Sequence, residues 1–211
     1  MEQEKVWQCQ REVQKIYEQF DASHDWQHIE RVMINAKTIL KQEAGDAFIV
    51  ELAVLLHDVS DPKYKKPEED LEQEILNRLE LPDAQRQQIQ DAIGSASFKG
   101  GNGKPAESIE AKIVQDADRL DAIGAIGIAR AFAYGGAKGR KLYNWTEKAR
   151  TEMTEQEYRE AQTSSVTHFY EKLLLLKDQM TTETGKQMAE ERHEFMLSFL
   201  KQLQTETDGN K

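Results

Sequence analysis

Apolar residues recur at intervals of three and four positions along most of this chain, which places them on one face of an α-helix. β-Strands would instead require a sustained apolar–polar alternation bounded by turn residues, and no stretch of the sequence has that pattern. The sequence therefore predicts an all-α fold, a helical bundle. Residues 25–43 show the helical spacing well, with apolar positions at Ile29, Val32, Met33, Ala36, Ile39 and Leu40.

The segment 46–57 is apolar on nearly every face, as expected of a helix that other helices surround. We expect it to be the central helix of the bundle. Glycine-rich segments at 99–105 and 135–139 predict two loops. Other helices are expected over 2–19, 67–81, 82–96, 108–132, 154–177 and 183–203.

The chain has 211 residues and contains no internal repeat or linker-like segment. These features predict a single domain over residues 1–211, with a tail that frays from about residue 205. The apolar helices near the carboxyl end could pack within that domain or form the interface of a homodimer.

The net charge of −10 argues against binding to a nucleic-acid polymer, because phosphate neutralisation requires a basic surface. No apolar run approaches the roughly 20 residues of a membrane span, so no membrane partner is expected. The amino terminus is polar and lacks the basic start and apolar middle of a secretory leader. Together with the single cysteine, Cys9, this leads us to expect a cytoplasmic protein.

Three predicted helices carry residues with metal-binding side chains. His28 lies on the second helix, His57 and Asp58 at the end of the central helix, and Asp118 on the helix over 108–132. Burying a histidine and an aspartate without partners costs roughly several kcal/mol. A divalent cation would supply the partner, because it accepts imidazole nitrogen and carboxylate oxygen together. The residues alone thus suggest a mixed metal site.

Each residue also has a structural interpretation. His28 viewed alone could be a hydrogen-bonded helix residue, and the pair at 57 and 58 could be a helix C-terminal stop. Asp116 competes with Asp118 for the role of the fourth ligand, since it lies two residues away on another face of the helix. We interpret His168 and His193, with their amphipathic neighbours, as structural.

The order of these residues resembles the signature of the HD-domain metal-dependent phosphohydrolases. Within that superfamily, the chain is similar to the small, single-domain bacterial branch over residues 20–200. The residues that carry the resemblance are His24 to His28 with Arg31 and Val32, Leu55 to Asp58, Asp116 to Gly127, His168 to Leu173, and Ala189 to Phe195.

The resemblance implies that one divalent metal is coordinated by His28, His57, Asp58 and Asp118. Mixed nitrogen and oxygen ligands suit Mn, which we favour, and also Co, Ni, Fe or Zn, whereas they are less typical of Mg. Similar nucleotidases have a glutamate three residues after the His–Asp pair, where this chain has Asp61. Asp61 is thus a candidate general base, although its shorter side chain weakens that role and a turn residue before a proline is the alternative.

His24 would share a face with His28 if the helix already includes it, and the resemblance suggests substrate contact or proton transfer. A residue that caps the helix start is the alternative. Candidate substrate contacts are Lys99, Arg31 and Arg119, whose cations could meet phosphate oxygens, and Asp121, which could orient a ligand or touch substrate.

The resemblance implies an enzyme that acts on a small phosphorylated substrate, a nucleotide. We expect a nucleoside triphosphate pyrophosphohydrolase that releases pyrophosphate. Other HD-type chemistries are a nucleoside monophosphate phosphatase and a cyclic nucleotide phosphodiesterase. A non-catalytic, nucleotide-sensing helical module is the alternative of a different class.

Overall fold

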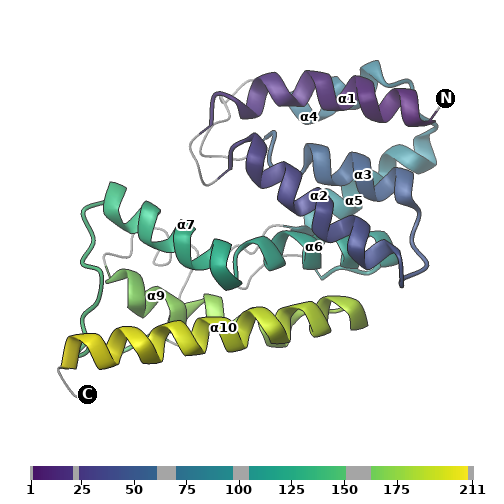
Figure 1. Ribbon diagram of the computed structural model, residues 1–211. Coiled ribbons are helices and arrows are strands. Elements are labelled where there is room, and N and C mark those ends of the chain that lie inside the picture. Colours follow the sequence, from purple (N-terminus) through teal and green to yellow (C-terminus); the bar gives the residue numbers. More distant parts are fainter. Residues whose placement is uncertain (1, 21–23, 61–69, 97–104, 151–162, 209–211) are drawn as a thin grey trace. The chain divides into compact units, whose positions relative to one another are not determined.

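A computed structural model describes residues 2–20, 24–60, 70–96, 105–150 and 163–208 (Figure 1). Every regular element among these residues is a helix, so the all-α prediction is confirmed. Contacts within the chain group it into two compact units, Met1–Asp118 and Arg119–Lys211. The expectation of one domain stays a prediction. None of the helices described is both long and apolar enough to cross a membrane.

The first unit contains the amino-terminal helices. The central one is α3 (Ala47–Leu56), which contacts α1, α2 and α5 and buries eight of its ten residues. Burying an aliphatic side chain contributes about 1.5–3 kcal/mol, so this helix anchors the unit. The others are α1 (Glu2–Tyr17), α2 (Trp26–Leu40), α4 (Leu71–Arg78), α5 (Asp83–Ala96) and α6 (Ile109–Asp121), which continues into the second unit.

Acidic caps define where the helices around the site begin. Asp46 precedes α3, and its side chain accepts hydrogen bonds from the backbone nitrogens of Phe48 and Ile49. Asp25 precedes α2 in the same way. Such caps satisfy backbone N–H groups that have no partner inside the helix. The predicted starts at residues 25 and 46 are therefore each the cap of the observed helix.

The second unit contains α7 (Gly124–Ala137), α9 (Ser165–Glu171) and α10 (Glu183–Asp208), with α10 packed against α7 and α7 against α9. Two 3₁₀ turns, η2 (Leu173–Leu175) and η3 (Lys177–Gln179), join α9 to α10. Helix α10, yellow in Figure 1, continues three residues past Thr205.

Two predictions in this unit were wrong. The predicted helix over 108–132 is broken after Asp121, and Gly124 takes the positive φ of 73° that opens α7. The predicted loop at Gly135 and Gly136 is instead the last turn of α7. A Cβ atom on Gly135 would lie 2.1 Å from Oγ of Ser165, so a glycine permits the close approach of α7 and α9.

The predicted long helix over 154–177 is also corrected within the described residues. Ser164 caps α9 by accepting a hydrogen bond from the backbone nitrogen of Thr167. The backbone leaves the helical region at Lys172, with φ −141° and ψ −61°, and the chain continues as short 3₁₀ turns. A helix of seven residues thus replaces the predicted one there.

Candidate metal centre

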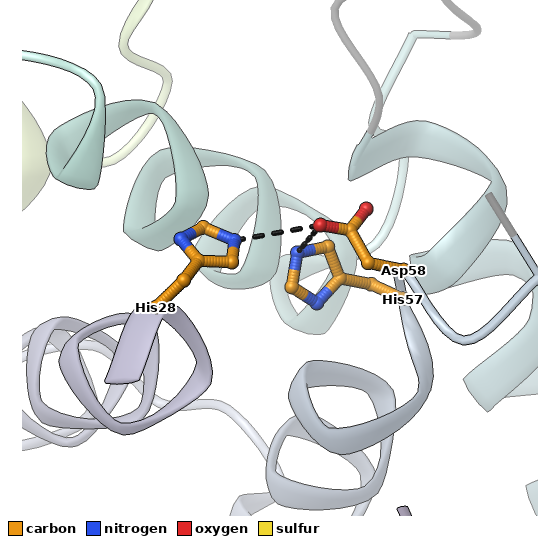
Figure 2. Close-up of side chains that lie close together, drawn as sticks. All are labelled: His28, His57 and Asp58. Carbon is orange, nitrogen blue, oxygen red and sulfur yellow. Dashed lines mark ion pairs between the residues drawn. The ribbon is translucent and has the colours of Figure 1, made fainter. Parts of the chain in front are cut away.

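His28 lies in the first turn of α2, where the cap fixes its position. Oδ1 of Asp25 accepts a hydrogen bond of 3.0 Å from the backbone nitrogen of His28. The imidazole is buried, with 1% of its side chain exposed. Figure 2 shows the ring directed toward Asp58, which follows the end of α3.

His57 is the C-terminal cap of α3, and its ring turns back on the helix. Nδ1 lies 2.9 Å from the carbonyl oxygen of Val54. Because a carbonyl oxygen can only accept, Nδ1 carries the proton and donates it. This bond satisfies one of the last carbonyls of α3 and directs Nε2 into the site.

Two carboxylates face the two imidazoles. Oδ2 of Asp58 lies 3.5 Å from Nε2 of His28 and 3.4 Å from Nε2 of His57. Oδ1 of Asp118, on α6, lies 3.5 Å and 3.7 Å from the same two nitrogens. The four predicted ligands therefore come together in the first unit from three separate stretches of sequence, with Asp118 supplying the carboxylate of the 116–121 run that contacts both rings.

The pKa values of these groups follow from their mutual charges. Burial alone would lower the pKa of His57, but the carboxylates of Asp58 and Asp118 outweigh it and raise the pKa to about 10. Burial would raise the pKa of Asp58, yet the imidazoles of His57, His28 and His24 hold that pKa well below its usual value. The pKa of Asp118 is lowered in the same way by His57 and His28. The cluster thus favours positive charge between its carboxylates.

The donor atoms fit a single metal ion. Two ligand atoms that each lie about 2.1 Å from one ion are about 3.0 Å apart at a right angle and about 3.4 Å apart at a tetrahedral angle. The observed nitrogen–oxygen separations are 3.4–3.7 Å. Nε2 of His57 is buried and makes no hydrogen bond, although the carboxylates are near. Ligand atoms of His28, His57 and Asp58 lie within 4.8 Å of one another and could hold a metal ion.

Comparison with known proteins places this arrangement in a family. The family model of the HD domain matches residues 25–123, the segment that contains all four residues. A crystal structure of an HD-superfamily hydrolase from Bacillus thuringiensis is 41% identical, with a TM-score of 0.77 over 99% of each chain. The chain belongs to the HD-domain family.

Two further relatives of this HD-domain protein span nearly its whole length. YpgQ of Bacillus subtilis (strain 168), an uncharacterized protein, is 40% identical over 99% of this chain and 94% of YpgQ. A crystal structure of YpgQ in complex with ADP has a TM-score of 0.75, 39% identity and coverage of 97% and 96%. A protein from Lactobacillus plantarum reaches a TM-score of 0.84 at 32% identity over 98% of each chain.

Family membership confirms the predicted enzyme class. The protein is a metal-dependent phosphohydrolase of the HD-domain type. HD domains bind divalent metal ions, and the cluster of His28, His57 and Asp58 could hold one.

The other described candidate residues of the first unit are His24, Arg31 and Asp116. Nε2 of His24 is 4.0 Å from Oδ2 of Asp58, and the His24 and His28 rings are 6.0 Å apart between centroids. Its side chain is 28% exposed, so it combines closeness to the cluster with access to solvent. Arg31 is partly buried one turn along α2 from His28. Asp116 is fully buried on α6.

Two candidates fall in the second unit and have partners there. Nη1 of Arg119 donates a hydrogen bond to the carbonyl of Gln179. Asp121 is buried, and its Oδ2 accepts a hydrogen bond of 2.6 Å from Nη1 of Arg130. The roles of both in substrate binding stay predictions, as do those of Asp61 and Lys99, which lie outside the described residues.

Sequence reasoning missed two buried polar side chains that hold the cluster's surroundings. The hydroxyl of Tyr17 contacts the backbone at Leu55 and Asp58, and Asn35 donates to the carbonyl of Ala117. The sequence signal that could have identified them is a polar group among the apolar residues of a helix face. Asn35 lies two turns after His28 on the buried face of α2, and a buried tyrosine needs a partner for its hydroxyl.

Proposed function

We propose that this HD-domain protein is a manganese-dependent nucleoside triphosphate pyrophosphohydrolase. The observation that carries the proposal is the cluster itself: two imidazole nitrogens, each within 3.4–3.7 Å of the carboxylate oxygens of Asp58 and Asp118. The complex of the related YpgQ with ADP supports a nucleotide as substrate. Release of pyrophosphate follows from the resemblance to the small bacterial HD phosphohydrolases.

His28, His57, Asp58 and Asp118 would hold the ion. Two carboxylates beside imidazoles give a site whose negative charge a divalent cation neutralises, and the mixed donor set suits manganese better than magnesium. When bound there, the ion would act as a Lewis acid that lowers the pKa of water and polarises a phosphoryl oxygen.

The chain's own residues would orient the reaction around that cluster. Nδ1 of His57, bonded to Val54, keeps the ring fixed, so that Nε2 stays aimed at the carboxylates. His24, partly exposed beside Asp58, would exchange protons with substrate or solvent. We assign Asp61 as the general base and Lys99 and Arg31 as phosphate contacts, with Arg119 and Asp121 as further candidates.

A product analysis tests the proposed function. Protein freed of metal by a chelator is incubated with Mn²⁺ and a panel of nucleoside triphosphates, monophosphates and cyclic nucleotides. We expect a triphosphate to give a monophosphate and pyrophosphate. Orthophosphate from a monophosphate would identify a phosphatase, and a linear product from a cyclic nucleotide a phosphodiesterase. Tight nucleotide binding without turnover would identify a sensing module.

Reaction in ¹⁸O-labelled water locates the bond that breaks. Attack at the α-phosphorus places the label in the monophosphate, whereas attack at the β-phosphorus places it in pyrophosphate. His57→Ala should abolish turnover, while His193→Ala, a matched histidine on α10, should retain it. Full activity of His57→Ala would overturn the assignment of the site.

A further inference from the structure

Two ligands of the proposed metal site stand at the end of α3, yet both follow its last helical residue. The last helical residue is Leu56, His57 is the cap, and Asp58 follows it. The carbonyls of a last helical turn have no partners inside the helix and must find them elsewhere. How those groups are satisfied therefore decides where the Asp58 carboxylate lies.

Three different groups satisfy the final carbonyls of α3. Nδ1 of His57 bonds to the carbonyl of Val54, and the backbone nitrogen of Val59 bonds at 3.2 Å to that of Leu56. The carbonyl of Leu55, between them, accepts a hydrogen bond of 3.1 Å from the hydroxyl of Tyr17. Tyr17, on another helix, thus supplies the hydrogen-bond donor for Leu55, whereas residues close in sequence supply the donors for Val54 and Leu56.

The same hydroxyl also receives a hydrogen bond from the metal-site residue. The backbone nitrogen of Asp58 donates to Oη of Tyr17 at 3.3 Å. A tyrosine hydroxyl has one proton to donate and lone pairs to accept, so both bonds can exist together. One oxygen atom therefore ties the carbonyl of Leu55 to the amide of Asp58.

The environment of Tyr17 makes this bridge rigid. Tyr17 is the last residue of α1, its side chain is fully buried, and α1 packs against α3. Its ring meets Phe20 edge-on, with centroids 5.4 Å apart, and lies 6.5 Å from the ring of Trp26. Packed rings of this kind leave the hydroxyl little freedom.

We propose that Tyr17 is a positioning residue for Asp58, which acts through the backbone of the α3 end and not by contact with metal or substrate. The inference rests on the proposed metal site. Partners that orient ligands in this way commonly change metal affinity by about tenfold or more when they are removed. Tyr17 would accordingly set how tightly the site holds its ion.

The test measures binding of Mn²⁺ alone, without nucleotide, from the electron paramagnetic resonance signal of the free ion. Tyr17→Phe keeps the buried ring and removes only the hydroxyl. We expect its Kd for Mn²⁺ to rise about tenfold, and the half-saturating Mn²⁺ for turnover to rise equally, with kcat restored at saturating metal. An unchanged Kd in Tyr17→Phe would overturn the proposal.

A matched variant separates positioning from general stability. Val6→Ala removes buried side-chain volume from the same helix, three turns before Tyr17, and touches no hydrogen bond at the site. We expect Val6→Ala to lower Tm while leaving the Kd for Mn²⁺ within about twofold of the wild-type value. An equal loss of affinity in both variants would show a merely structural role and refute the proposal.

Wild-type protein gives an answer even if Tyr17→Phe does not fold. Without metal, hydrogen exchange of the Asp58 amide should be slowed at least tenfold relative to an unprotected amide, because that amide is bonded to the Tyr17 hydroxyl. Exchange at the unprotected rate would overturn the proposal. If the wild-type protein binds no Mn²⁺, the proposed metal site itself is refuted. Failure of the metal site is thus distinguishable from failure of the role proposed for Tyr17.

Discussion

Asn35 and Ala117 are joined by a hydrogen bond of 3.0 Å from Nδ2 of Asn35 to the carbonyl oxygen of Ala117. Asn35 is on α2, the helix that carries His28, and Ala117 immediately precedes Asp118 on α6. The bond therefore links the helices that carry two proposed ligands, His28 and Asp118, and both bonded residues are buried.

Replacing Asn35 with Leu should destabilise the protein by about 1–3 kcal/mol, because a buried hydrogen bond to the Ala117 carbonyl is lost. Urea unfolding measures the change. Thr38→Ala is the control, since its hydroxyl donates to the carbonyl of Ile34 on the same helix face, and its stability should stay within about 0.5 kcal/mol of wild type. Equal stability of the Asn35 variant and wild type would contradict the expectation.

Asp118→Asn and Asp116→Asn distinguish the two carboxylates of α6 that are candidates for the fourth ligand. Asp118 contacts both imidazoles, so its isosteric amide should weaken Mn²⁺ binding at least tenfold and reduce kcat/KM by about a hundredfold or more. Asp116→Asn should keep the Kd for Mn²⁺ within about threefold of the wild-type value. Calorimetric titration measures the Kd for Mn²⁺ of both variants. A larger loss of affinity in Asp116→Asn than in Asp118→Asn would move the ligand assignment to Asp116.

Mn²⁺ should stabilise the protein, since a ligand that binds only the folded state shifts the unfolding equilibrium. At a free concentration of about 100 times Kd, the expected stabilisation is about 2.7 kcal/mol, seen as a rise in Tm. EDTA should reverse it. The rise should vanish in His57→Ala and persist in His193→Ala; a persistent rise in both would place the bound ion elsewhere.

Glu147 gives the second unit a pH-dependent contribution to stability. Burial would raise the pKa of Glu147, but hydrogen bonds from Thr167, Ser164 and Asn144 outweigh it and lower the pKa to about 2. The unfolded chain, with its ordinary pKa near 4.5, binds the proton first as the pH falls. The stabilisation is therefore complete above about pH 5 and is lost as the pH falls toward 2.

Comparison with Glu147→Gln isolates this contribution. At pH 7 the variant should be less stable than wild type by about 1–3 kcal/mol, and the difference should shrink below pH 5. Chemical denaturation at several pH values measures it, with the exposed Glu194→Gln as control. A difference that stays constant from pH 7 to pH 2 would show that Glu147 has no lowered pKa.

Local sequence signals predicted the parts of the fold that local physics decides. The apolar run at 46–57 identified the central helix, and acidic residues such as Asp25 and Asp46 marked the helix starts because their side chains cap the backbone there. The order of His28, His57, Asp58 and Asp118 predicted a cluster that the structure brings together.

Contacts between distant segments decided the rest. Gly135 has a poor helix propensity and predicted a loop, yet its lack of a side chain lets α7 pack against Ser165. The sequence predicted no role for Tyr17 at the site, since nothing near it in the sequence shows that its hydroxyl meets Asp58, 41 residues later. Such pairings depend on tertiary packing, which helical periodicity does not encode.

Helix α3 is almost entirely buried, and the proposed metal ligands His57 and Asp58 stand directly at its end. Any repacking that shifts or rotates this helix must therefore carry the pair along. Core substitutions far from the ligands, at sites such as Ile49 or Leu52, should register as altered ion affinity before the protein loses its secondary structure. The affinity measured in a metal titration would then also report whether core packing around α3 is preserved when this chain is engineered.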